Sequence, residues 1–435
     1  MSNIHFLRHM KVRFFSVKTD IKLDDTTNTL LDNNFLKHRK HPGITSLQFI
    51  EIPKWIINSV QTVLEDTTLS KKGWYEGGKK LAQYLHGRRI SIEQQNLKER
   101  SKKSHADNTD KNANEFHEKA YSRQPQHGQH IYNSSAIQYN RQTGLYYVAG
   151  RSLYDYSVLY NVLNQIKTSD NSFKPKTLFD FGSGIGTVMW AASQLWPETL
   201  QEYFAVDPSP EMNNLSEELA KQNIHPIKGI FYRQFFPAAS VPSYDIVISS
   251  FSLLDLPDIR TRFNVIQKLW SKTKNYLIII EEGTNAGFTA VNEARHIVLY
   301  NLNLKSDGNN NNFAHVFAPC PHDMQCPRYT TDNTPCNFEI SYNTLPLSGS
   351  SILKRERFSY VILKKGVRPN DDKQWPRIVR PTLKRSKHVI CRTCTATGKL
   401  EEYIFTSYKY GKNAYRCARA SKWGDLLPIE VNKDK

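Results

Sequence analysis

Between Thr177 and Ile280 short apolar runs alternate with amphipathic stretches, which predicts strands alternating with helices. The expected strands are Thr177–Phe181, Tyr203–Val206, Ile230–Phe235, Tyr244–Ser249 and Tyr276–Ile280, and the expected helices are Val188–Trp196, Pro210–Gln222 and Pro257–Ser271. Strands that are apolar throughout are typical of parallel sheets buried on both faces. We therefore expect a doubly wound α/β domain, a parallel sheet with helices on both sides, over residues 131–310.

The segments on either side of this domain have other patterns. Residues 20–100 show helical spacing, with Ile56, Val60 and Val63 on one face. Residues 101–130 are almost devoid of apolar side chains, which predicts a flexible linker. Residues 311–435 contain short apolar runs and a Thr397-Gly398 turn, which predict a β-rich C-terminal region.

Composition adds a strong positive charge. Lys and Arg outnumber Asp and Glu by 59 to 41, a net charge of +18. Basic chains of this kind bind polyanions, and RNA or DNA is the leading class, although proteins of the mitochondrial matrix are also often basic. No apolar run approaches the length of a membrane span, so we expect a soluble protein.

The first nineteen residues form a segment of their own. They carry Arg8, Lys11, Arg13 and Lys18 among apolar side chains and contain no acid. This composition is typical of a mitochondrial transit peptide, here with cleavage after Phe15, although an ordinary basic arm has the same composition.

A glycine-rich turn follows the first strand of the α/β region. The sequence Asp180-Phe-Gly182-Ser183-Gly184-Ile-Gly186 stands between strand and helix, where glycines allow a ligand to approach the backbone. The glycines have the spacing Gly-x-Gly-x-Gly, which differs from the Gly-x-Gly-x-x-Gly motif that binds the pyrophosphate of a dinucleotide. Asp207 closes the second strand, where a carboxylate can accept the hydroxyls of a ribose. This arrangement resembles S-adenosylmethionine-dependent methyltransferases, and we expect Asp180, Gly182, Ser183, Gly184, Gly186 and Asp207 to bind that cofactor.

Evidence for methyl transfer is weaker. The fourth strand ends in Ser249-Ser250-Phe251-Ser252, which matches no motif for methylating an amino group. No cysteine precedes Cys320, which disfavours a cysteine nucleophile. Asp255 and Glu281 remain as carboxylates at the expected pocket rim. We name no catalytic residue.

Six cysteines cluster late in the chain, too few for a disulfide framework. Cys320, Cys326 and Cys336 lie within seventeen residues, beside prolines that are typical of iron–sulfur loops. A fourth thiolate would have to come from Cys391 or Cys394. Zinc is the rival metal, because Cys391 and Cys394 have zinc-knuckle spacing.

Several further motifs occur in a fixed order. They are Arg151, Val206-Asp-Pro-Ser209, Glu282-Gly-Thr-Asn-Ala-Gly-Phe288, Ala294-Arg295, the Cys320-Pro-His-Asp-Met-Gln-Cys326-Pro loop, Lys387-His388-Val389, Tyr415-Arg416, Ala418-Arg419 and Trp423-Gly424-Asp425. In this order the motifs resemble the methyltransferase-like protein seventeen family of mitochondrial small-ribosomal-subunit assembly factors, and the resemblance runs from about His41 to the C-terminus.

The resemblance implies a mitochondrial matrix protein that binds the maturing small subunit, its rRNA and its ribosomal proteins, but not membrane or DNA. It implies a 4Fe-4S cluster on Cys320, Cys326, Cys336 and Cys394, with Cys391 outside the pattern. It also implies a fold that keeps S-adenosylmethionine while methyl transfer is lost. The alternative is an active methyltransferase of small-subunit rRNA.

The basic tail gives a physical basis for RNA contact. Residues 376–399 hold seven Lys or Arg and no acid, with Trp375 and Tyr403 nearby for stacking. Phosphate neutralisation supplies affinity without reading sequence. A solvated strand surface is the simpler interpretation of the same charges.

Overall fold

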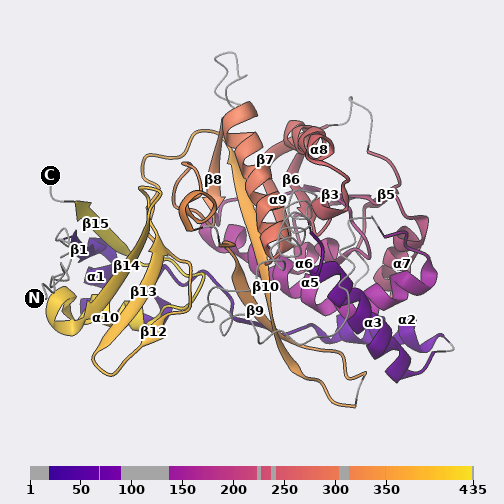
Figure 1. The fold of residues 1–435 in the computed structure, drawn as a ribbon, viewed down its shortest axis with the longest axis horizontal. Helices are drawn as coiled ribbons and strands as arrows, with labels where there is room; N and C mark the ends of the chain where they lie inside the picture. The colour runs from indigo at the N-terminus through magenta and orange to yellow at the C-terminus, as the bar shows by residue number, and fades with distance from the viewer. Residues whose placement is uncertain are drawn as a thin grey trace, which may run out of the picture.

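The computed structural model describes residues 19–67, 69–89, 137–222, 227–236, 242–302, 313–332, 334–347 and 349–433. The expected linker at 101–130 and all but the last residue of the expected transit peptide lie outside these ranges. Figure 1 shows a large sheet with its helices on the right and a smaller C-terminal sheet on the left. Within the described ranges, no helix combines the length and apolar character needed to cross a membrane.

Five parallel strands form the centre of the large sheet. They are β3 (Thr177–Phe181), β4 (Glu202–Val206), β5 (Ile230–Arg233), β6 (Tyr244–Ser250) and β7 (Thr273–Glu282), in the order β5-β4-β3-β6-β7. Helices α6 (Thr187–Leu195), α7 (Pro210–Lys221) and α8 (Ile259–Lys272) connect them. The alternation predicted from the sequence is confirmed, because each apolar run became a strand. Strands β6 and β7 are buried along most of their length, whereas the edge strand β5 is only half-buried.

The sheet is mixed, so the expectation of an all-parallel sheet was wrong at one edge. Strand β10 (Leu353–Lys365) pairs antiparallel with β7, and β8 (Ala314–Ala318) and β9 (Phe338–Asn343) pair antiparallel with β10. Strand β2 (Phe49–Ile50) runs parallel to β9. The sheet thus extends beyond the domain boundary expected at residue 310. A local apolar pattern predicts a buried strand but does not state its direction.

Helices cover both faces of this sheet. Helices α5 (Arg141–Ser169), α6 and α7 pack on one face, and α8 and α9 (Asn285–His296) pack on the other. Helices α2 (Lys54–Glu65) and α3 (Lys71–His86) add a layer over α5 and α7. The crossing of α3 and α5 depends on a glycine pair, because a Cβ on Gly150 would lie 2.4 Å from the carbonyl oxygen of Gly78. The core is thus doubly wound, with antiparallel β10 beside β7.

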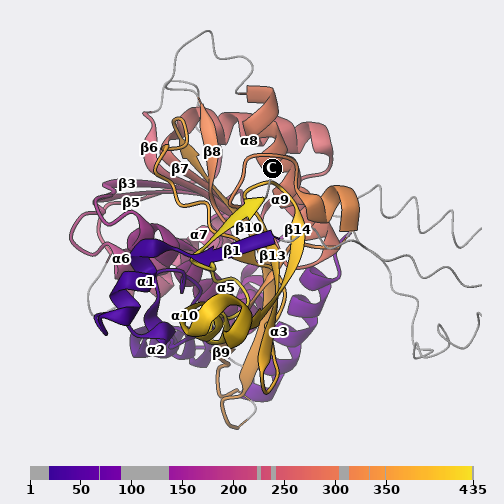
Figure 2. The ribbon, with the colours of Figure 1, turned by 90° about the vertical axis from the view of Figure 1, so that its left-hand side faces the viewer.

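The C-terminal sheet contains β11 (Arg377–Ile378), β12 (Leu383–Lys384), β13 (His388–Cys394) and β14 (Leu400–Thr406), and α10 (Ser407–Ala420) packs against β13 and β14. Beside it, β1 (Thr19–Leu23) pairs antiparallel with β15 (Ile429–Lys433), as Figure 2 shows. The N-terminal region is therefore not purely helical, because its first described segment completes the C-terminal body. The remaining elements are α1 (Asp25–Asp32), η1 (His38–Lys40), η4 (Leu253–Asp255), η5 (Ile297–Leu302) and η8 (Arg328–Asp332).

Candidate functional site

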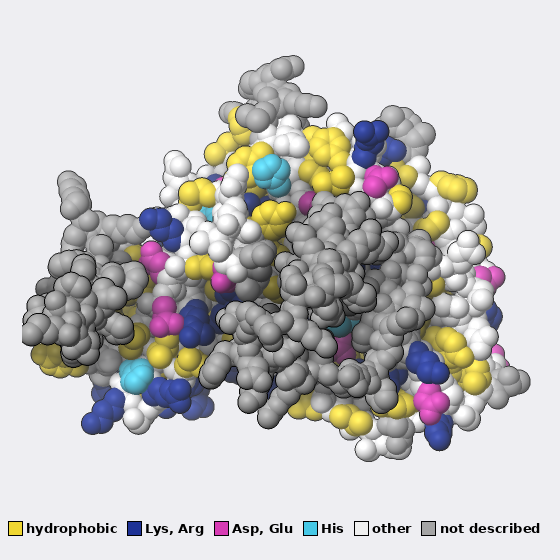
Figure 3. Space-filling view, viewed as in Figure 1, with side chains coloured by type: hydrophobic (Ala, Val, Ile, Leu, Met, Phe, Trp, Pro, Cys, Tyr) yellow, Lys and Arg dark blue, Asp and Glu magenta, His cyan; other side chains and the backbone are white. Residues whose placement is uncertain are grey.

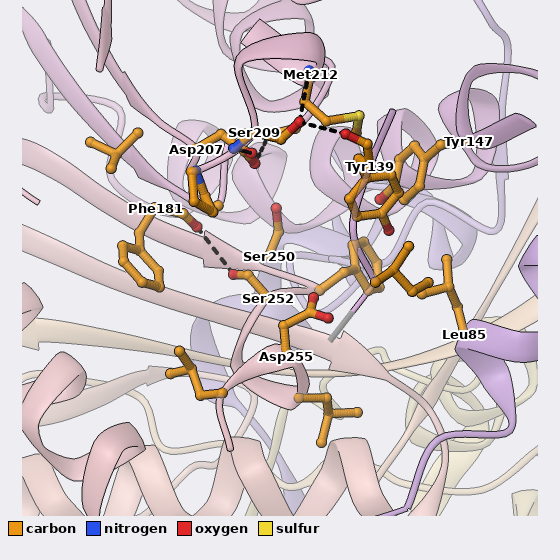
Figure 4. Close-up of a pocket in the computed structure, with 18 of the residues that line it drawn as sticks. Leu85, Tyr139, Tyr147, Phe181, Asp207, Ser209, Met212, Ser250, Ser252 and Asp255 are labelled. Carbon is orange, nitrogen blue, oxygen red and sulfur yellow. Dashed lines mark hydrogen bonds between the residues drawn. The ribbon is translucent and has the colours of Figure 1, made fainter. Parts of the chain in front are cut away.

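A cavity of about 550 Å³ lies beside the C-terminal ends of β3, β4 and β6. This is the edge at which ligands bind in open α/β sheets, and the volume suits a small-molecule ligand. Figure 4 shows Asp207 beside Ser209, Ser250 and Ser252 in the centre, and Tyr139 next to Ser209, whose hydroxyl donates to the Tyr139 carbonyl at 3.2 Å.

The glycine turn folds tightly under this cavity. The backbone N–H groups of Gly182 and Ser183 donate to the carbonyl of Val206, at 2.8 and 3.1 Å. Gly182 has φ +72°, and a Cβ there would lie 2.4 Å from the Cβ of Ser252. A side chain at this position would therefore clash as well as strain the backbone, so the turn requires glycine.

Asp207 connects the turn to the next helix. Its Oδ2 accepts a hydrogen bond from the N–H of Gly184 and its Oδ1 accepts one from the N–H of Ser209, both at 2.9 Å. Burial raises the pKa of Asp207 despite these two bonds. Each carboxylate oxygen has two acceptor positions, so Asp207 retains capacity for ligand hydroxyls.

The structure divides the six predicted cofactor residues into two groups. Gly182, Gly184 and Asp207 line the cavity, whereas Asp180, Ser183 and Gly186 do not. Asp180 is completely buried, and neither of its carboxylate oxygens has a hydrogen-bond partner in the described chain; the Ser183 hydroxyl also lacks one. Because these unpaired groups do not reach the cavity surface, only Gly182, Gly184 and Asp207 of the six are placed to contact a ligand there.

The opposite wall contains charged groups that sequence reasoning largely missed. Arg88 forms an ion pair with Asp255, and Arg151 contacts Glu282 at 2.7 Å. All four side chains line the cavity, together with Glu281. Asp255 and Glu281 were expected there. Arg88 was not, because it follows a helix in a segment without any motif. Arg151 could have been noticed in the sequence, because it is a charged residue within a helical segment that is otherwise largely apolar.

The end of β6 shows how the serines in the candidate acceptor region are used. The Ser249 and Ser252 hydroxyls are 2.8 Å apart, and Ser252 donates to the carbonyl of Phe181 at 3.1 Å. Phe251 between them has φ +55°, a left-handed conformation that is costly for an aromatic residue. Backbone strain of this kind is typical of ligand sites. The serines hold the β6 loop against β3.

A second candidate site lies where the large sheet meets the C-terminal sheet. Cys320, Cys326, Cys336 and Cys394 are free thiols, and the first three line one small cavity. Burial, followed by the neighbouring Cys320, raises the pKa of Cys326 to about 11. Burial and the other thiols raise the pKa of Cys394 well above its usual value. The four predicted ligands therefore lie close together.

Cys391 lies elsewhere. It is fully buried in the core of the C-terminal body with Phe405 and Cys417. This placement agrees with Cys394 as the fourth member of the group. In the described part of the chain, no three His, Cys, Asp or Glu side chains are arranged to hold a single metal ion.

The loop from Cys320 to Cys326 is positioned by α9. The Arg295 guanidinium donates to the carbonyls of His322 and Met324, at 3.0 and 2.6 Å. The Nε2 atom of His322 lies 3.3 Å from the Cys394 sulfur. His322 thus contacts a thiol of the group.

Comparison with known proteins gives the family. Residues 141–428 match the model of the family described as mitochondrial small ribosomal subunit Rsm22. The chain belongs to the Rsm22 family. It is 36% identical over 401 residues to the human mitochondrial ribosome assembly protein METTL17, which covers 90% of this chain and 86% of the human protein. Membership places it among mitochondrial ribosome assembly proteins, as the sequence motifs predicted.

Other relatives cover smaller parts. The chain is 32% identical over 329 residues to the mitochondrial Rsm22-cox11 tandem protein 2 of Schizosaccharomyces pombe, covering 66% of this chain and 43% of that protein. Among solved structures, it is 14% identical to magnesium protoporphyrin IX methyltransferase of Synechocystis with bound S-adenosylmethionine, covering 48% of this chain and 79% of that one, at a TM-score of 0.31. A putative RNA methyltransferase of Pyrococcus horikoshii gives 13% identity, 49% and 83% coverage, and a TM-score of 0.29.

Proposed function

We propose that this protein is an assembly factor of the mitochondrial small ribosomal subunit, that it acts in the matrix by binding the maturing subunit with its rRNA and ribosomal proteins, and that it has lost methyl transfer. The relatives named for ribosome assembly support the first part. The basic charge supports contact with RNA. We keep the first nineteen residues as the proposed transit peptide.

The main support for the loss of methyl transfer is that two serine hydroxyls at the end of β6 are taken up by hydrogen bonds within the protein. Ser249 and Ser252 bond to each other, and Ser252 also bonds to the β3 backbone. A catalyst needs a group that accepts a proton from the methyl acceptor. Of the carboxyl groups in the facing wall, Asp255 and Glu282 form ion pairs with Arg88 and Arg151. The pKa of Glu281 is raised to about 8, chiefly by burial, which favours its protonated form at pH 7. S-adenosylmethionine would be held by Gly182, Gly184 and Asp207 as a ligand.

The proposed inorganic cofactor is a 4Fe-4S cluster on Cys320, Cys326, Cys336 and Cys394. The grouping of four free thiols supports it. A single zinc ion requires all its sulfurs at about 2.3 Å from one point. A cluster of several irons holds its ligands farther apart. The choice of the cluster over a single zinc ion rests on the resemblance to the family, in which these four cysteines are the ligands.

The second candidate function is an active rRNA methyltransferase, which the retained cavity favours. One substitution distinguishes the assembly factor without methyl transfer from the active methyltransferase. Ser250 lines the cavity, and its hydroxyl points into it in Figure 4. Ser250→Trp would fill the space while keeping the bonds of Ser249 and Ser252, and Ser250→Ala is the control that leaves the cavity open.

Both variants are tested by complementation in cells that lack the protein. If Ser250→Trp is folded and restores small-subunit assembly and mitochondrial translation as Ser250→Ala does, methyl transfer is dispensable. If it stays folded and bound to the subunit, but assembly fails and a defined rRNA methyl group is lost, the protein is an enzyme.

A further inference from the structure

Helix α10 carries a row of basic side chains along its exposed face. Lys412, Arg416 and Arg419 are spaced by four and three residues, so they share one side of the helix, and all three are exposed. The other side of the helix, with Ala414 and Cys417, is buried against the C-terminal sheet. No acidic residue occurs from 403 to 424. The helix itself therefore presents a positive edge, and an acid from another element, Asp32 of α1, reaches it through Asn413, whose amide donates to its carboxylate at 2.7 Å.

The turn between β12 and β13 extends this positive edge. The guanidinium of Arg419 donates to the carbonyl of Arg385 at 2.7 Å, which joins the turn to the helix. Lys384 and Lys387 are exposed in the same turn. Burial, followed by the charges of Lys422 and Arg419, lowers the pKa of Lys384, so like charges are crowded here. In Figure 3 Lys and Arg side chains gather at the lower left, over the end where β12 and β13 lie.

A third segment lies against the same helix. The Nε2 atom of His38 in η1 contacts the Oδ1 atom of Asn413 at 3.0 Å. Lys37, Arg39 and Lys40 beside it are exposed. Three parts of the chain thus bring basic groups to α10. Crowding of like charge destabilises a fold unless a polyanion offsets it.

An aromatic side chain stands at the start of the helix. Tyr408 is fully exposed. The turn that carries it is ordered, because the Thr406 hydroxyl accepts from the N–H of Lys409 at 3.1 Å and the Tyr410 ring packs on Phe405 at 5.4 Å. Gly411, with φ +78°, separates this turn from the rest of α10. Tyr408 is therefore presented to solvent by a fixed element.

We propose that this surface binds rRNA, with Lys412, Arg416 and Arg419 along the phosphate backbone and Tyr408 stacked on an unpaired base. The partner is thus an RNA element in which a paired stem meets an unpaired nucleotide. Phosphate contacts supply affinity and position, and an aromatic ring stacks on any base. The inference rests on the proposed function and adds the RNA class and the residues. An acidic protein is the alternative partner. It would pair with the basic side chains of α10, but it would give the exposed Tyr408 ring no base to stack on.

Binding is measured by fluorescence anisotropy of the full chain with two labelled RNAs of equal charge, a hairpin with an unpaired loop and a blunt duplex. The triple variant K412E/R416E/R419E is compared with K72E/K80E/K167E, which changes the same charge at exposed lysines of α3 and α5. The α10 variant should bind both RNAs roughly 100-fold more weakly, and its salt slope should be smaller by about 2–3, since each phosphate contact contributes about 0.7–0.9. The control should change affinity only weakly.

Tyr408→Ala should weaken binding to the hairpin by about ten-fold, within the range of base stacking, and leave the duplex unchanged. Tyr408→Phe keeps the ring and should bind like wild type. Equal effects of Tyr408→Ala on both RNAs, no effect on either, equal effects of the two triple variants, or equal competition by polyglutamate would overturn the proposal. If wild-type protein binds neither RNA, the proposed function itself fails. Melting curves establish that each variant is folded.

Discussion

Two neighbouring carboxyl groups at the end of β7 show how single residues set the chemistry of the cavity. Burial raises the pKa of Glu281 to about 8, although the N–H of Leu253 donates to it at 2.7 Å. Burial acts on Glu282 in the same direction, but the charge of Arg151 and the hydrogen bond from His86 outweigh it and lower its pKa. Both groups line the same cavity, so the difference between them comes from the Arg151 and His86 partners of Glu282.

Glu281 gives a pH-dependent stability. Its pKa is about 8 in the folded protein against 4.5 in the unfolded chain, so the folded state holds a proton that unfolding releases. This contribution is complete below about pH 4.5 and is lost as the pH rises to about 8. Glu281→Gln keeps an acceptor for Leu253 but cannot ionise. The free energy of unfolding of wild type minus that of the variant should fall by up to about 1.4 kcal/mol per pH unit across this window. Both free energies are measured by urea unfolding at each pH. If their difference does not change with pH, Glu281 titrates with an ordinary pKa in the folded protein.

At the scale of elements, α5 is joined to β7 and β10 by a buried polar network. The Arg151 guanidinium contacts Asp155 at 2.9 Å and Glu282 at 2.7 Å, and it lies 4.3 Å from the Tyr154 ring centre. The Tyr154 hydroxyl donates to the carbonyl of Arg357 in β10. A buried charge pair is costly to form, but it is costlier to leave one partner alone.

Arg151→Ala should therefore destabilise the protein by about 3–5 kcal/mol, because it leaves the buried Asp155 without a cation and Glu282 with the His86 imidazole alone. Arg141→Ala is the matched control in the same helix. Arg141 pairs with Glu218 in an exposed position, and its loss should cost no more than about 1 kcal/mol. Adding Glu282→Gln to Arg151→Ala should recover part of the stability. Equal midpoints of chemical unfolding for the two single variants would contradict this role for Arg151.

The element pattern was the most predictable part of the molecule. Strand β3 was expected at its observed bounds, and most other central elements differ by a few residues, because buried runs and helical spacing are local signals. The direction of β10 and the pairing of β1 with β15 were not predictable, since both depend on contacts between distant segments. Arg88 was missed for the same reason: its partner Asp255 is far away in sequence.

On the scale of the whole molecule, the thiol group connects three separate parts of the chain. Cys320 and Cys326 lie in the loop after β8, Cys336 immediately precedes β9, and Cys394 ends β13 of the C-terminal sheet. Spacing alone left Cys391 and Cys394 as alternatives. In strand β13 the two residues point to opposite faces, because they are three positions apart. Cys391 enters the core of the C-terminal body, and Cys394 faces the large sheet's thiols.

This arrangement predicts different outcomes for two buried thiols of one strand. Cys394→Ser should remove a proposed cluster ligand, and Cys391→Ser is the matched control. Anaerobically purified wild-type and Cys391→Ser proteins should be brown, with close to four iron and four sulfide per chain, as a 4Fe-4S cluster requires. Cys394→Ser and Cys326→Ser should lose this iron. Because metal binding contributes to folding, they should also release the C-terminal sheet to proteases at lower temperature than the control. Colourless wild-type protein with one zinc per chain would refute the cluster. If Cys394→Ser loses its iron but keeps its protease resistance, the wild-type protein binds the cluster, but the cluster does not hold the C-terminal sheet. The sheet is then held by its packing alone.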